Sequence, residues 1–154
     1  MKQNAAKRDL SIKIVTALVV IMMAGFFIAS IYINVLIIAA VITLVILIIC
    51  YLYAPRAFEI SDSKLIVYRN YGEIEFSNVT ACRYIEDKVP FTLRLWGNGG
   101  VFAGTGIFWN SRFGVFRMYV TNAKQKEFVL VETEDRIIII SPENPEEFIE
   151  RWNT

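Results

Sequence analysis

The chain has 154 residues, of which 55% are apolar and 20% are charged, and its formal net charge is +1. Soluble domains of this size are about 45–50% apolar, so the excess points away from an ordinary soluble domain. There is no histidine, and the two cysteines, Cys50 and Cys82, lie far apart. These counts exclude histidine-dependent catalysis, histidine metal ligands and a CxxC redox or zinc site, and the near-neutral charge gives no indication of nucleic-acid binding.

The apolar residues are concentrated near the N-terminus. The 40 residues from Ile14 to Tyr53 carry no charged side chain. One helix of this length would measure about 60 Å, twice the thickness of a bilayer core, whereas about 20 helical residues are enough to cross it. We therefore predict two transmembrane helices, Ile12–Ile31 and Val35–Tyr53, joined by a turn at Ser30–Asn34 that holds the polar residues in the middle of the run.

Basic residues flank this hairpin (12–53) on both sides, and its turn has no charge. Lysine and arginine concentrate in cytoplasmic segments, so we expect the basic N-terminus (1–11) and the C-terminus on the cytoplasmic side of the inner or plasma membrane, with the chain integral to that membrane. A signal peptide cleaved near Ala29 and Ser30 is the alternative, although a second apolar run follows directly. The flanking basic residues are Lys2, Lys7, Arg8 and Lys13 before the hairpin and Arg56, Lys64 and Arg69 after it.

Small residues recur at a spacing of four on both predicted spans, Gly25 and Ala29 on the first and Ala39 and Thr43 on the second. This spacing lets two helix backbones approach closely, and we expect the hairpin to pack on itself there. Homodimerisation through the same residues is the alternative. The interior of both spans holds no charged residue, which argues against a transporter or channel.

The sequence after Tyr53 predicts a separate β-rich domain, residues 56–154. Pro55 ends the helical segment. Short segments of alternating or β-branched residues, separated by polar turns, then follow as expected for antiparallel strands. Val115–Thr121 alternates well, and the four isoleucines of Ile137–Ile140 suit a central strand covered on both sides. The predicted strands are Arg56–Ile60, Lys64–Arg69, Glu73–Phe76, Val79–Ile85, Phe91–Trp96, Val115–Thr121, Glu127–Glu132 and Arg136–Ser141.

A short amphipathic helix is predicted at the C-terminus. Asn144 is a good N-cap, Pro145 suits the first helical position, and Glu147 has the spacing of a capping box. Phe148 and Trp152 fall on one face, so we expect this helix to cover the open end of the strands. About seven strands and one helix indicate a mainly β fold, either a small barrel or a pair of orthogonal sheets.

The domain ends in the segment ISPENPEEF at residues 140–148, and its centre carries a glycine–aromatic segment from Gly104 to Asn122. With the two N-terminal spans, these features resemble the bacterial pleckstrin-homology-like (PH-like) domain family of small membrane proteins, over about residues 56–152. The resemblance implies a seven-stranded PH-like barrel or sandwich with a C-terminal capping helix. PH domains often bind phosphoinositides through basic residues in their first hairpin loop. That loop here is the acidic and polar Ser61-Asp62-Ser63, so the resemblance does not extend to this activity.

The segment between Gly97 and Gly114 holds six of the eight glycines, among aromatic and arginine residues. It lacks both the lysine of a phosphate-binding loop and the helix that follows a GxGxxG motif, so nucleotide binding is not expected. The segment predicts a long loop, either a structural connection or a recognition loop. Aromatic residues with arginines are typical of protein interfaces and also suit lipid headgroups. The candidate ligand- or partner-binding residues are Arg94, Trp96, Phe108, Trp109, Arg112 and Arg117.

The remaining polar residues do not indicate catalysis or metal binding. The glutamates of the C-terminal segment suit the positive end of a helix dipole, and Cys82 has no histidine to activate it. We therefore predict a non-enzymatic binding or scaffolding module, with no cofactor, metal or nucleotide, that recognises a protein partner at the membrane. A homo-oligomer, a lipid-headgroup-sensing domain and a structural subunit of a membrane complex are the alternatives.

Overall fold

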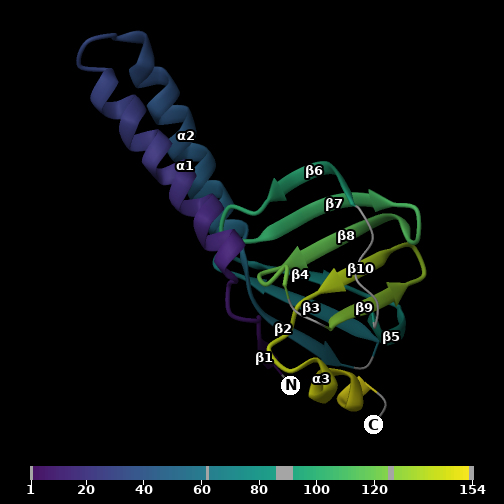
Figure 1. Cartoon of the computed structure of the whole chain (residues 1–154). Helices are drawn as coiled ribbons and strands as arrows, with labels where there is room; N and C mark the ends of the chain where they lie inside the picture. Colours follow the sequence, from purple (N-terminus) through teal and green to yellow (C-terminus); the bar gives the residue numbers. More distant parts are fainter. Residues whose placement is uncertain (1, 62, 86–91, 125–126, 153–154) are drawn as a thin grey trace.

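The computed structural model describes residues 2–61, 63–85, 92–124 and 127–152. Two long helices form a hairpin that projects from a domain built of two β-sheets, and a short third helix lies on this domain (Figure 1). The molecule therefore has two parts, an apolar helical hairpin and a β-rich domain, as the sequence predicts.

The hairpin consists of α1 (Leu10–Ala29) and α2 (Val35–Tyr53), so two helices lie where the two spans are predicted. Asp9 caps α1, and its carboxylate accepts a 2.8 Å hydrogen bond from the backbone N–H of Ile12. Each helix is long and apolar enough to cross a membrane, yet only 6% and 11% of the residues in their most apolar windows are buried. The apolar side chains of the hairpin therefore face outward and do not form the core of the β-rich domain.

Gly25 does not contribute to the packing of the hairpin as its spacing predicts. A Cβ added at Gly25 would meet no atom within 4 Å, so this glycine does not lie against the second helix. Ala40 and Leu47 are instead the buried residues of α2. The expectation that Gly25 brings the two backbones together is wrong, because the contacting face of the hairpin is rotated away from it.

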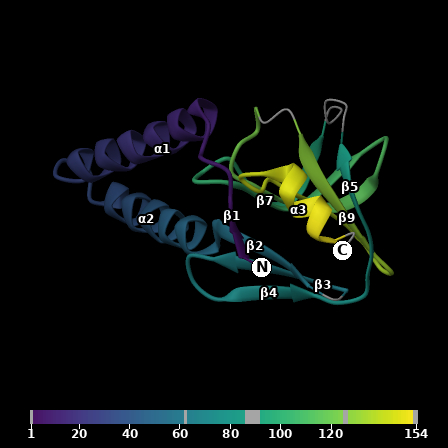
Figure 2. The same cartoon turned by 90° about the horizontal axis from the view of Figure 1, so that it is seen from below.

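The first sheet has four antiparallel strands in the order β1-β2-β3-β4. Its first strand precedes α1, whereas its second strand follows α2 directly. Lys2 pairs with Glu59 and Asn4 pairs with Ala57, and Figure 2 shows β1 beside β2 where both helices meet the domain. The hairpin therefore starts and ends in adjacent strands of one sheet. These strands are β1 (Lys2–Asn4), β2 (Pro55–Ser61), β3 (Lys64–Arg69) and β4 (Glu73–Phe76).

The second sheet has six strands in the order β5-β9-β10-β8-β7-β6, in which β10 runs parallel to β8 and all other pairs are antiparallel. The described strands thus form two separate sheets with ten strands in total. The expectation of a closed barrel and the count of seven strands are wrong, whereas a two-sheet arrangement is found. The strands are β5 (Val79–Ile85), β6 (Leu93–Gly99), β7 (Gly104–Asn110), β8 (Gly114–Val120), β9 (Phe128–Thr133) and β10 (Ile137–Ile140).

The main core lies between the two sheets and the C-terminal helix. Phe58 and Val67 of the first sheet pack with Val131 and Ile138 of the second sheet, and Phe148 of α3 closes this cluster. A smaller cluster on the other face of the second sheet contains Ile139. The isoleucines of β10 are therefore buried on both faces, as the sequence predicts for a central strand.

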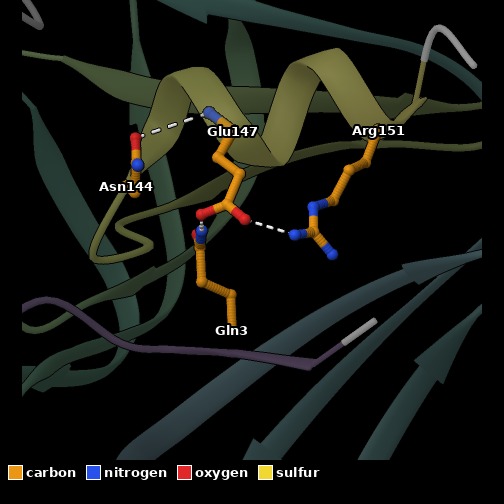
Figure 3. Close-up of polar contacts among 4 residues, drawn as sticks. All are labelled: Gln3, Asn144, Glu147 and Arg151. Carbon is orange, nitrogen blue, oxygen red and sulfur yellow. Dashed lines mark hydrogen bonds and ion pairs between the residues drawn. The ribbon is translucent and has the colours of Figure 1, made fainter.

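The C-terminal helix α3 (Pro145–Trp152) joins the core to the N-terminal strand (Figure 3). The side chain of Asn144 accepts a 3.4 Å hydrogen bond from the backbone N–H of Glu147, which confirms the predicted cap. The carboxylate of Glu147 pairs with Arg151 and accepts a 3.3 Å hydrogen bond from Gln3. One side chain of α3 therefore contacts the segment that leads into the hairpin.

Strands, and not a long loop, occupy most of the segment between Gly97 and Gly114. A short turn joins β6 to β7, and a second one joins β7 to β8. Gly97 and Gly106 are paired across β6 and β7 with φ angles of +111° and +137°. A Cβ at Gly97 would lie 2.3 Å from the carbonyl oxygen of Thr105. These two glycines are therefore required by a close approach of two strands, which explains part of the glycine enrichment.

Candidate membrane-interface site

The turn between β6 and β7 contacts the lower part of the helical hairpin. The backbone N–H of Phe102 donates a 2.9 Å hydrogen bond to the hydroxyl oxygen of Thr16 in α1. The Phe102 ring packs edge-on against Tyr51 of α2, with ring centroids 5.5 Å apart, and the Arg8 guanidinium lies 5.4 Å from the ring centroid. Phe102 adopts a φ angle of +63°, which is uncommon for a bulky residue. This turn therefore holds both helices of the hairpin.

The turn between β3 and β4 contacts the end of α2. The backbone N–H groups of Asn70 and Tyr71 donate hydrogen bonds to the carbonyl oxygens of Ala54 (3.1 Å) and Leu52 (3.0 Å). The side-chain amide of Asn70 donates another, of 2.8 Å, to the carbonyl oxygen of Tyr51. The last carbonyls of a helix lack hydrogen-bond donors within the helix, and here the β-rich domain supplies these donors. The hairpin is thus attached to the domain by hydrogen bonds on two sides.

Aromatic and basic side chains surround this attachment. Tyr51, Tyr53, Tyr71 and Trp96 are all exposed although they are large, and Trp96 is 78% exposed. Tyrosine and tryptophan concentrate at the level where a membrane-spanning segment meets the headgroups, and basic residues there attract anionic lipids. On another side of the attachment, a shallow pocket of about 410 Å³ is lined by the basic residues Lys7, Arg8, Lys13 and Arg56.

A second cavity, which we call the interface pocket, lies between the end of α2 and the two sheets. It has a volume of about 380 Å³, and its lining includes two arginines but no acidic residue. The Arg69 guanidinium carbon lies 4.5 Å from the Tyr53 ring centroid, and within the described parts of the chain the buried Arg69 Nε atom has no hydrogen-bond partner. Its lining residues include Cys50, Tyr53, Arg69, Trp96, Arg117 and Tyr119.

The strands β6, β7 and β8 continue outward from this pocket and present a row of apolar side chains. Leu93 pairs with Trp109, and Trp109 pairs with Val115. Directly paired residues of antiparallel strands share one face of the sheet, and these three side chains are 51%, 43% and 59% exposed. We call them the apolar row. Exposed apolar patches on a folded domain typically mark sites of interaction.

The structure separates the six candidate site residues into different surroundings. Trp96 and Arg117 both line the interface pocket, and Trp109 belongs to the apolar row. Arg112 lies in the turn between β7 and β8, with its guanidinium 5.2 Å from the Phe113 ring centroid. Phe108 is a core residue that is 5% exposed and stacks on Phe116, and the side chain of Arg94 lies over Gly99.

Sequence analysis missed the residues that the hairpin and the first sheet bring to the interface pocket. The sequence predicts Arg69 as a flanking charge, Tyr53 as the end of a span and Cys50 as a cysteine without a nearby partner. One signal was available in the sequence, because tyrosines at the end of an apolar run are typical of a membrane interface. Arg69 is the last residue of β3, so only the folding of the first sheet brings it to the end of α2.

The described residues do not contain a constellation that suggests chemistry on a substrate. Within the parts of the chain that the structure describes, no three histidine, cysteine, aspartate or glutamate side chains are close enough to hold a metal ion. Burial raises the pKa of the Cys82 thiol to about 12, so the reactive thiolate is scarce near neutral pH.

Comparison with known proteins places the β-rich domain in a family. Residues 56–154 match the family described as "Bacterial PH domain", and the match begins within β2, after the helical hairpin. No curated protein and no solved structure matches the chain. Two apolar helices precede a two-sheet domain that closes with a C-terminal helix, in agreement with the resemblance carried by the sequence. The chain belongs to the bacterial PH domain family.

Proposed function

We propose that this protein is a membrane-anchored, non-enzymatic binding module that recognises a protein partner at the cytoplasmic face of the inner or plasma membrane. The hairpin of α1 and α2 crosses the bilayer twice, and the PH-like domain lies directly against the headgroups. The apolar row of Leu93, Trp109 and Val115 is the surface that the partner contacts.

The pairing of β1 with β2 is the observation that carries the anchoring part of the proposal. β1 precedes the hairpin and β2 follows it, yet Gln3 lies opposite Phe58 in one sheet. Ala5 and Ala6 extend this attachment by donating 2.9 Å backbone hydrogen bonds to the carbonyls of Arg56 and Ser141. A hairpin whose two ends belong to one folded sheet can insert only with both ends on the same side of the membrane.

The distribution of charge supports the cytoplasmic side. The pocket lined by Lys7, Arg8, Lys13 and Arg56 lies at the base of the hairpin, whereas the turn between the two helices has no charged residue. Lysine and arginine close to the ends of spans favour the cytoplasmic side, where anionic lipids also give the surface a negative potential.

The exposure and rigidity of the apolar row support a protein partner. Its three side chains come from three paired strands of one sheet, so they are held in fixed positions. Trp109 is a large aromatic of the kind that dominates the energy of protein interfaces. Arg112 is exposed in the adjoining turn, and arginine is also enriched at such interfaces.

Site-specific photocrosslinking in native membranes tests this proposal. We expect a photoreactive phenylalanine analogue at Trp109 or Val115 of the full chain to give a discrete protein adduct on illumination. The same analogue at Thr80, an exposed residue of β5, provides the control and should give no such adduct. An adduct of twice the chain mass would identify the partner as a second copy.

Two results would contradict the proposal. One is the absence of any protein adduct from both Trp109 and Val115, and the other is an identical set of adducts from Thr80. The substitution pair Trp109→Ala and Arg112→Ala should reduce the adduct formed from Val115 while changing the free energy of unfolding by less than about 1 kcal/mol, because these side chains lie at the surface.

A further inference from the structure

The interface pocket lies at the depth where α2 leaves the apolar part of the molecule. Cys50 lines the pocket and precedes the end of α2 at Tyr53 by three residues, a distance of about 5 Å along the helix axis. Trp96 lines the pocket from β6, the edge strand that Figure 1 shows on the side from which the hairpin projects. A molecule of the surrounding bilayer would therefore meet this pocket with its headgroup region.

The charge of the interface pocket is positive. Arg69 and Arg117 are among the lining residues, and none of those residues is an aspartate or glutamate. Both guanidinium groups lie near aromatic rings: Arg69 is 4.5 Å from the ring centroid of Tyr53, and Arg117 is 5.8 Å from that of Phe76. Aromatic faces orient guanidinium groups without neutralising their charge, so an anion in the pocket would be attracted by both.

One hydrogen-bond donor of Arg69 is left available by the side chains around it. Its Nε atom is buried and finds no acceptor among the residues that the structure describes. One of its terminal nitrogens donates to the backbone oxygen of Glu73 at 3.5 Å. Leaving a buried donor of a charged group unpaired is costly, and most such groups in folded proteins find a partner. A phosphate oxygen suits the planar fork of donors that arginine presents.

We propose that the interface pocket binds the phosphate group of an anionic phospholipid, held by Arg69 and Arg117. The apolar side of the lining supports a lipid over a free phosphate ion, because Ile49, Cys50 and Ile74 also contribute to the wall. Trp96 and Tyr53 flank the phosphate at the level typical of interfacial aromatic residues. This site requires the membrane insertion stated in the proposed function, but it does not depend on the protein partner.

Photocrosslinking of the full chain in lipid nanodiscs tests the site. The discs contain phosphatidylcholine with a photoactivatable phosphatidylglycerol, and the adducts are located by peptide mass spectrometry. We expect adducts on peptides that line the pocket, and a loss of about tenfold or more with Arg69→Gln and Arg117→Gln together, since two charge-assisted contacts are removed. The charge-matched control is Arg83→Gln with Arg136→Gln, two exposed arginines away from the pocket, which should label as the parent chain does.

Further experiments test whether the bound phosphate belongs to an anionic lipid, and control for misfolding of the variants. Equal labelling by a photoactivatable phosphatidylcholine, or loss of labelling when inorganic phosphate is added, would overturn the assignment to an anionic lipid. Equal labelling in the glutamine pair and in its control would overturn it as well. If the glutamine pair does not fold, Arg69→Lys with Arg117→Lys keeps both charges and should give intermediate labelling, whereas undiminished labelling would contradict the role of the arginine fork.

Failure of this inference is distinguishable from failure of the proposed function. Resistance of the chain to alkaline extraction from membranes, and the protein adduct from Trp109, report insertion and partner binding without involving Arg69 or Arg117. Intact extraction resistance and an intact protein adduct, together with no lipid labelling at the pocket, would remove the lipid site alone.

Discussion

At the scale of single residues, the buried thiol of Cys82 gives a clear prediction. Its pKa is raised to about 12 by burial, so at pH 8 only about one thiol in ten thousand is the reactive thiolate. In a Cys50→Ala background, we expect iodoacetamide to leave Cys82 unmodified in the folded protein at pH 8 and to modify it fully after denaturation. Mass spectrometry of the intact chain measures both states, and rapid modification of the folded chain would contradict the burial.

The same thiol also makes stability depend on pH in a defined direction. Its ordinary pKa of 9.0 applies to the unfolded chain, and the folded value is higher. The unfolded state therefore ionises first, so the contribution of Cys82 to the free energy of unfolding is intact below pH 9 and decreases as pH rises from 9 towards 12. Cys82→Ala lacks this group and is the control, and denaturation curves at pH 8 and pH 10 should differ more for the parent chain.

The candidate site could be predicted only in part from single residues. Trp96, Trp109 and Arg117 were selected because arginine with aromatic residues indicates an interface, and the structure places all three on the exposed or pocket-lining side of β6, β7 and β8. Phe108 has the same composition signal but points to the opposite face and is buried. The residue types of a segment do not reveal which side chains face the core and which face outward, because this depends on where the strand lies and on its register.

At the scale of elements, the short strand β1 and the residues after it carry the most informative contacts. The backbone N–H of Ala6 donates to the buried Ser141 carbonyl, and the Thr121 hydroxyl donates a 2.5 Å hydrogen bond to the Ala6 carbonyl. Ala6→Pro removes the donor and leaves the Ser141 oxygen unpaired. We expect a loss of about 1–3 kcal/mol in the free energy of unfolding, measured by tryptophan fluorescence of the full chain in detergent.

Ala6→Gly is the matched control for this element. Glycine keeps the backbone N–H group and should cost no more than about 1 kcal/mol, through the entropy of the unfolded chain. Equal stability of the proline and glycine variants would show that the N-terminal segment does not pair with the rest of the domain.

The elements that sequence analysis missed share a physical reason. Helices and hairpin strands follow from local patterns, and the pattern predicts the strand Glu73–Phe76 with its observed bounds. β1 has three polar residues and no alternation, so only its pairing with β2 makes it a strand. The glycines of β7 predict a loop because glycine is common in turns, whereas here they allow a close approach of strands. The parallel pairing of β10 with β8 is a long-range feature that no local pattern encodes.

At the scale of the whole molecule, the arrangement of the sheet and the hairpin predicts a topology that labelling can measure. Tyr32 lies in the turn of the hairpin and is 86% exposed, and Ser77 is an exposed residue of the β-rich domain. We expect a membrane-impermeant maleimide to label Tyr32→Cys in intact spheroplasts, and to label Ser77→Cys only after permeabilisation. The reason is that both ends of the hairpin are tied into one sheet.

The parent chain is the control for background labelling of its two native cysteines. Labelling of Ser77→Cys in intact spheroplasts would place the β-rich domain outside the cell and contradict the proposed location. Protection of Tyr32→Cys under both conditions would show that the turn of the hairpin does not emerge from the membrane.

The contacts of Phe102, Asn70 and Tyr71 with the helical hairpin have a mechanical consequence. Because these residues bond to α1 and to the last carbonyls of α2, no loose linker separates the helices from the sheets. Helices tilt by about 20° on average and adjust their tilt to bilayer thickness. If the hairpin spans the bilayer as proposed, a change in bilayer thickness would tilt it, and the strands that carry Trp109 would turn through the same angle. A partner bound at Trp109 would then change its orientation with lipid composition.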